Sequence, residues 1–113
     1  MGTNRRYPGL GARLGEEREL REARKRGTLR SLTDEQLGLR RAVVSLVPED
    51  TVIWALAWLK FGEVDVRATV RVGRWTAAAV GVEVEVPDSD EKLRCWVWRG
   101  AVEFLQRRED AWQ

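Results

Sequence analysis

Strict alternation of apolar and polar side chains dominates the second half of the chain. From residue 64 to residue 72 every second side chain is Val or Ala, and Asp, Arg and Thr fill the places between. A period of two is typical of a strand with one buried face. The same pattern recurs over residues 80–86 and 93–97. We therefore predict three strands in these segments.

Residues 52–61 are apolar at odd and even positions alike, so the pattern allows either a strand or a helix. The β-branched start and the tryptophans favour a strand, whereas the central Ala-Leu-Ala run would suit a helix. Gly-Glu at residues 62–63 and Gly-Arg at residues 73–74 are typical of turns, and the polar run 87–91 is typical of a loop. Four short strands joined by turns predict a meander that curls to protect its edges.

The C-terminal segment begins with a tight break after Trp98, and more apolar residues follow. A strand, one helical turn and a short closing strand is how SH3-like barrels end. The competing interpretation makes residues 101–112 a helix on an open sheet, with Val102, Leu105 and Trp112 facing inward. We predict an α+β protein, an N-terminal helical segment followed by a small antiparallel SH3-like β-barrel. In this single domain, residues 1–47 form a basic arm with helices and residues 51–113 form the barrel.

Residues 12–26 combine strong helix formers with few breakers, and Gly27 is suited to end the helix. The apolar positions form no continuous stripe, so we expect this helix to bury little. Charge pairs four residues apart support it instead. The apolar positions are Leu14, Leu20 and Ala23, and the charge pairs are Glu17–Arg21 and Glu22–Arg26. Either the helix is solvated and frays or a partner orders it, and deleting residues 1–26 should leave a folded barrel.

A second, shorter helix is predicted from a capping signal. Thr33 stands three residues before Gln36, which is the spacing of a capping box. We expect a helix over residues 34–41. The residues expected to turn inward are Leu37 and one of Val43 and Val44.

Composition excludes several kinds of chemistry. The 113 residues include no histidine and a single cysteine, Cys95. Ser-His-Asp and Cys-His catalysis, imidazole metal sites and intramolecular disulfides are therefore excluded. The acidic residues within 83–91 lack the spacing of a calcium-binding EF-hand loop. We expect a protein that is not an enzyme and has no cofactor or metal. The lone cysteine and the polar N-terminus lead us to expect a soluble, cytoplasmic protein.

Charge is distributed unevenly between the two halves. Residues 1–41 carry eleven Lys or Arg against six Asp or Glu, a net charge of +5, whereas residues 42–113 carry nine against twelve, a net charge of −3. The pattern predicts a basic arm on a mildly acidic body. Such an arm could contact phosphates, an acidic partner surface or the acidic body itself.

Aromatic and basic residues supply two candidate sites. Trp96 and Trp98 share one face of the predicted strand with Arg94, and with Trp75 they form a candidate protein-docking surface. Alternatively, the N-terminal helices cover this face as a second small core. The basic arm is a candidate nucleic-acid site, or else solvated surface. Its residues are Arg5, Arg6, Arg21, Arg24, Lys25, Arg26 and Arg30.

Several short segments carry a resemblance to a known group. They are the opening Met-Gly-Thr-Asn-Arg-Arg-Tyr-Pro, Ser31-Leu-Thr, the Ala57-Trp-Leu-Lys-Phe-Gly run, Trp75-Thr with Ala79-Val80, and Cys95-Trp-Val-Trp with Ala101-Val102. Together they resemble small uncharacterised proteins of actinobacteria and their phages. The resemblance implies an accessory protein of a phage or mobile element. The acidic region 82–91 departs from that group, which puts any shared ligand in doubt.

Two functions from different classes follow. In the first, the protein is a non-catalytic adaptor or inhibitor that docks a protein partner through the Trp/Arg face of the barrel. In the second, the basic arm binds nucleic acid and the barrel is a scaffold. The net acidic charge of the barrel favours the first.

Overall fold

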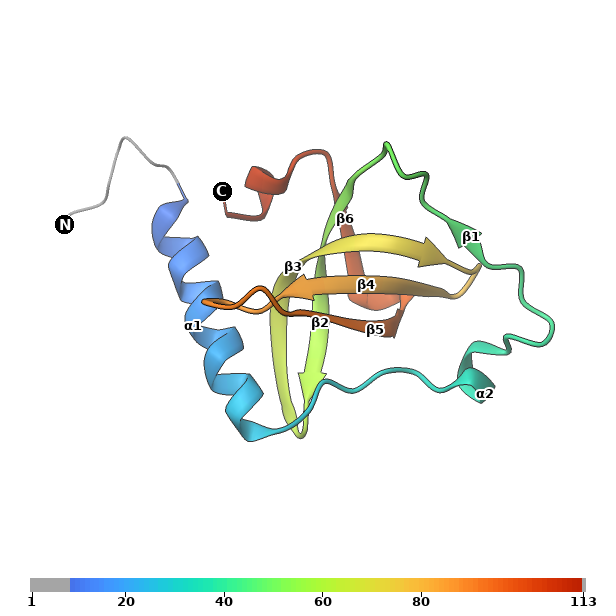
Figure 1. The fold of residues 1–113 in the computed structure, drawn as a ribbon, viewed down its shortest axis with the longest axis horizontal. Coiled ribbons are helices and arrows are strands. Elements are labelled where there is room, and N and C mark those ends of the chain that lie inside the picture. Colours follow the sequence, from blue (N-terminus) through green and yellow to red (C-terminus); the bar gives the residue numbers. More distant parts are fainter. Residues whose placement is uncertain (1–8, 113) are drawn as a thin grey trace.

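The computed structural model describes residues 9–112, which form one long helix and a six-stranded antiparallel sheet (Figure 1). The α+β class predicted from the sequence is therefore correct. The helical elements are α1 (Leu10–Arg26), α2 (Asp34–Leu37) and the 3₁₀ turns η1 (Arg99–Ala101) and η2 (Arg108–Trp112). The strands are β1 (Ser45–Leu46), β2 (Ile53–Phe61), β3 (Val64–Trp75), β4 (Ala79–Glu85), β5 (Lys92–Trp98) and β6 (Val102–Leu105).

The strands lie in the order β5-β4-β3-β2-β6, and β1 pairs with the end of β3. Residues 53–61 are a strand, so the helical alternative for this segment is wrong. The helical alternative for residues 101–112 is wrong as well, because β6 follows η1 and pairs with β2. In this order β5 and β6 stand at opposite ends, and the sheet is not closed. The structure thus confirms the α+β class without confirming an SH3-like barrel.

The predicted turn at residues 73–74 is wrong. Both residues lie inside β3, and the register with β4 shifts between Val72 and Arg74. Gly73 is therefore the extra residue of a β-bulge. The chain turns later, where the hydroxyl of Thr76 accepts hydrogen bonds from the backbone N–H groups of Ala78 and Ala79 at 3.3 and 3.1 Å.

The core lies against one face of the sheet, here called the inner face. Alternate residues of the four long strands supply it, and they include Ala55, Ala57, Leu59, Phe61, Val66, Ala68, Val70, Val72, Val80, Val82, Val84, Cys95 and Val97. The opposite face of the same strands is called the outer face. Alternation along the sequence predicted these faces correctly as far as the bulge, because each strand keeps a period of two; beyond Gly73 the parity of β3 reverses.

Helix α1 completes this core, contrary to the expectation that it buries little. Leu20 and Ala23 are only 6% and 1% exposed and belong to the core cluster. Two ion pairs join α1 to the loop between β4 and β5, Arg21–Asp88 at 3.0 Å and Arg24–Glu91 at 2.6 Å. The helix lies beside that loop and beside the β2–β3 hairpin (Figure 1). It therefore seals one end of the core, and its basic residues contact the acidic body.

The charge pairs predicted within α1 do not form. Within the helix the ion pairs are Arg13–Glu17 at 3.6 Å and Glu22–Lys25 at 3.2 Å. Arg21 is instead drawn to Asp88, which is 67 residues away in sequence. The helix itself spans nearly the predicted range and ends before Gly27.

The segment after α1 connects two distant parts of the sheet. The backbone N–H of Arg30 donates to the carbonyl of Lys60 in β2 at 2.8 Å. Two residues later, the N–H of Leu32 donates to the carbonyl of Trp96 in β5 at 3.0 Å, and the N–H of Trp96 donates to the hydroxyl of Ser31 at 2.8 Å. Residues 28–32 therefore satisfy backbone groups along the edge of β5 that would otherwise be unpaired.

The capping box at Thr33 and Gln36 is confirmed, but the helix is shorter than predicted. It ends at Leu37 because Gly38 adopts a left-handed conformation with φ 62°. Leu37 is buried as expected. Val43 and Val44 are both exposed, so the expectation that one of them turns inward is wrong.

Candidate functional site: a basic and aromatic groove

The predicted Trp/Arg face is present on β5. Cys95 and Val97 point into the core, which places Arg94, Trp96 and Trp98 on the outer face. Trp98 is 45% exposed, and Trp96 is half-buried. The long helix α1 does not cover this face, because it packs against β3 and the β4–β5 loop. Helix α1 therefore does not cover the Trp/Arg face to form a second small core, which was the alternative prediction.

Trp75 does not belong to this face. It is paired with Val80, whose side chain lies in the core, and it borders a small pocket with Ile53 and Phe104 at one end of the inner face. The bulge at Gly73 is the cause, since one extra residue reverses the parity of the strand beyond it. Arg74 takes the place beside Trp96 that the sequence suggested for Trp75.

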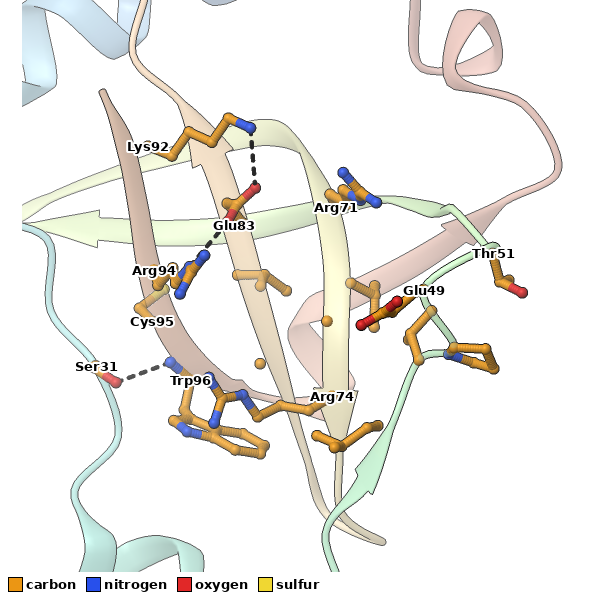
Figure 2. A pocket seen from close by; sticks show the side chains of 17 residues that line it. Ser31, Glu49, Thr51, Arg71, Arg74, Glu83, Lys92, Arg94, Cys95 and Trp96 are labelled. Carbon is orange, nitrogen blue, oxygen red and sulfur yellow. Dashed lines mark hydrogen bonds and ion pairs between the residues drawn. The ribbon is translucent and has the colours of Figure 1, made fainter. Parts of the chain in front are cut away.

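A groove of about 620 Å³ lies over the outer face of β3, β4 and β5 (Figure 2). Leu46 of β1 and the segment that follows it as far as Thr51 border the groove on the side of β3, and Ser31 borders it on the side of β5. This is the outer groove, and its charged and aromatic lining consists of Glu49, Arg71, Arg74, Glu83, Lys92, Arg94 and Trp96. Its volume is in the range of small-molecule and peptide sites.

Glu83 is the central charge on the floor of the outer groove. It is only 18% exposed and accepts a hydrogen bond from Nε of Arg94 at 2.9 Å, while Nζ of Lys92 lies 3.9 Å away (Figure 2). Among residues 9–112, neither Arg71 nor Arg74 has a carboxylate within 4.0 Å. Two guanidinium groups of β3 thus keep their donors available to a ligand.

Arg74 reaches across the groove floor toward Trp96. Its guanidinium carbon lies 5.9 Å from the centroid of the Trp96 ring, within the range of a cation–π contact. The side chain passes over Gly81 of β4, where an added Cβ would lie 2.7 Å from Cγ of Arg74. Glycine at this position is therefore what allows the arginine to lie flat against the sheet.

The basic arm is not part of the outer groove. Arg21 and Arg24 form ion pairs with the β4–β5 loop, Lys25 with Glu22, and Arg30 with Glu63 at 2.7 Å. Arg26 is exposed in the last turn of α1. Arg5 and Arg6 lie outside the described residues. Four of the candidate phosphate contacts are thus paired with carboxylates of the protein itself.

Cys95 lies beneath the floor of the groove with its side chain in the core. Burial raises the pKa of its thiol from 9.0 to about 11. The group is therefore a protonated thiol at neutral pH and a weak nucleophile. Within residues 9–112 no cluster of three or more Cys, Asp or Glu side chains is arranged to hold a metal ion.

No family model, curated protein or solved structure matches the chain. Within the described residues, no helix is both long and apolar enough to cross a membrane.

The sites predicted from the sequence include Arg94 and Trp96 as groove residues but do not include Arg71, Arg74 and Gly81. The alternation of apolar and polar residues already places Arg71 on the polar face of its strand, so the sequence alone was enough to identify it. The position of Arg74 depends on the bulge, and a Gly-Arg pair after an alternating run is equally typical of a turn.

Proposed function

We propose that this protein is a non-catalytic binding protein, an adaptor or inhibitor, that docks a protein partner in the outer groove. Arg94, Trp96 and Trp98 are part of the docking surface, and Arg71 and Arg74 extend it. The proposal rests on one observation, the two arginines without a carboxylate partner beside a tryptophan in a concave surface. Arginine and tryptophan are the residues most often found at the energetic centres of protein interfaces.

The proposal includes an SH3-like arrangement of the sheet. Its support is the strand order, the 3₁₀ turn η1 between β5 and β6, and the return of β6 to pair with β2. Residues 28–32 add hydrogen bonds to both β2 and β5. Amide–amide contacts measured by NMR in solution that place β5 and β6 far apart would contradict it. The resemblance to actinobacterial and phage proteins and the buried lone thiol support, within the same proposal, an accessory role in the cytoplasm.

Nucleic-acid binding by the arm has less support. A phosphate that approached Arg21 or Arg24 would have to displace Asp88 or Glu91. The outer groove itself contains Glu49 and Glu83. These carboxylates would repel a continuous line of phosphates.

Selection from a displayed library of random peptides tests the proposal without assuming a ligand sequence. Enriched peptides should bind the wild type and should lose about tenfold or more in affinity on a variant with Arg74→Gln and Trp96→Ala. The matched control is Arg18→Gln, which removes one exposed positive charge from α1. Thermal melts followed by circular dichroism establish that each variant is folded.

Two results would contradict the proposal. One is equal binding of all enriched peptides to the wild type and the double variant. The other is the absence of groove-dependent peptides together with binding of random duplex DNA that weakens steeply with salt. Loss of that DNA binding on replacement of Arg24, Lys25 and Arg26 by glutamine would then assign the function to the arm.

A further inference from the structure

Two rows of side chains cross the floor of the outer groove. The strand registers make the first row Arg71, Glu83 and Arg94, and the second row Arg74, Gly81 and Trp96. On β4 and β5 the rows are two residues apart, which corresponds to about 7 Å along a strand. The bulge at Gly73 lets β3 keep this spacing, because Arg71 and Arg74 stand opposite β4 residues that are two positions apart.

The two rows differ in which of their charged side chains already have a partner of opposite charge. In the first row Glu83 is held by Arg94, with Lys92 nearby, and Arg71 has no carboxylate within 4.0 Å among residues 9–112. In the second row Arg74 faces a glycine and an indole ring. Each row therefore offers one guanidinium that a carboxylate could pair with in a forked, two-bond geometry.

We infer that the outer groove takes an extended acidic segment of a partner protein in which carboxylates alternate, as in Glu-x-Glu or Asp-x-Asp. This inference rests on the proposed function. In an extended chain, side chains two residues apart point to the same side and are separated by about 7 Å, the spacing of the two rows. One carboxylate then meets Arg71 in the first row, and the next meets Arg74, whose side chain crosses Gly81 toward Trp96 in the second row.

The charge of the lining favours such a segment over nucleic acid. The groove has four basic side chains and two acidic ones, a small positive excess. The walls on the β3 and β5 sides direct an extended ligand along the strands. A peptide with alternating carboxylates turns a charge toward the floor only at every second residue, whereas a phosphodiester chain would present a charge to Glu49 and Glu83 at every step.

Three fluorescent peptides with identical Gly/Ser flanks test the inference by anisotropy on the full chain. The first contains Glu-Ser-Glu, the second contains the same residues as Ser-Glu-Glu, and the third contains Gln-Ser-Gln. Adjacent carboxylates point to opposite sides of an extended chain, so only the first should engage both arginines. We expect the first to bind about tenfold more tightly than the third, with the second between them. A single-stranded DNA oligonucleotide of random sequence is measured beside them.

Variants of the two rows complete the test. Arg71→Gln and Arg74→Gln should each remove most of the preference for the first peptide, and Arg18→Gln should leave it unchanged. Gly81→Ala should weaken binding without altering charge, because the added methyl group displaces Arg74. Equal binding of the first two peptides, or tighter binding of the oligonucleotide, overturns the inference. If the library selection yields groove-dependent peptides without acidic residues, the proposed function stands and this inference fails.

Discussion

Glu16 of α1 is bonded to Thr69 of β3 through both of its carboxylate oxygens. The backbone N–H of Thr69 donates to Oε1 at 2.6 Å, and the hydroxyl of Thr69 donates to Oε2 at 2.9 Å. Nε1 of Trp112 donates to the same carboxylate at 2.7 Å. Because pairing of β3 with β4 begins only at Arg71, the N–H of Thr69 lies at an unpaired edge of the strand. One side chain thus ties the helix, the sheet and the C-terminal turn together.

Replacing Glu16 by alanine should therefore destabilise the whole protein. We expect a loss of about 2 kcal/mol or more in the free energy of unfolding, since three donors lose a charged acceptor. Urea unfolding followed by tryptophan fluorescence measures the change. The control is Glu19→Ala on the same helix, where the side chain is exposed and the effect should stay within about 0.5 kcal/mol. Similar losses in the two variants would show that these hydrogen bonds contribute little.

Two leucines of α1 should respond very differently to truncation. Leu20→Ala removes a side chain that is 6% exposed and should lower the free energy of unfolding by about 2–5 kcal/mol. Leu14→Ala removes a side chain that is 48% exposed and should lower it far less, and urea unfolding of the two variants measures the difference.

The burial of Leu20 also revises the expectation that residues 1–26 can be deleted. The truncated chain should expose Phe61 and its neighbours and should aggregate or unfold, as size-exclusion chromatography would reveal. A monomeric, cooperatively folding truncated chain would contradict this.

Two glycine-to-alanine changes should have opposite signs. Gly15 is inside α1 with open space where a Cβ would lie, so alanine should stabilise the protein by about 0.5–1 kcal/mol. Gly27 is packed against Gly62, and its Cβ would lie 2.6 Å from the Cα of that residue. Gly27→Ala should lower the melting temperature, because backbone on both sides must separate. Equal shifts of the melting temperature in the two variants would refute the close contact.

The buried thiol of Cys95 predicts a dependence of stability on alkaline pH. Its pKa is raised by burial from 9.0 to about 11, so the unfolded chain loses this proton first as the pH rises. The contribution of Cys95 to the free energy of unfolding is fully present below pH 9 and declines as the pH rises toward 11. The free energy of unfolding of the wild type, measured relative to that of Cys95→Ala, should fall over this range. Alkylation of the native protein at pH 8 should also be slow, and rapid alkylation there would contradict the burial.

The strands were predictable because each carries a local signal. Alternation marked the inner and outer faces of β3, β4 and β5, and the capping box marked the start of α2. Those features depend on side chains only a few residues apart. The same local signal on β5 correctly identified Arg94 and Trp96 as outward-facing.

What the sequence did not reveal depends on contacts between distant segments. Leu20 is buried because β4 leaves β3 and opens a gap in the sheet that a helix can fill, and no periodicity within α1 indicates that gap. The pairing of Arg21 with Asp88 is of the same kind. Arg74 was missed for a different reason, since a bulge and a turn share the same local residues.

The bulge at Gly73 also suggests how the ligand preference of this fold could change in evolution. If Gly73 were instead drawn into regular pairing with β4, the parity beyond it would reverse, so that Arg74 would turn toward the core and Trp75 would come onto the outer face. A basic recognition surface would become an aromatic one through a shift of register at one residue, with no change in the side chains that the chain carries there. Natural relatives of the same strand length that lack the bulge should therefore prefer apolar segments, which the same peptide selections would detect.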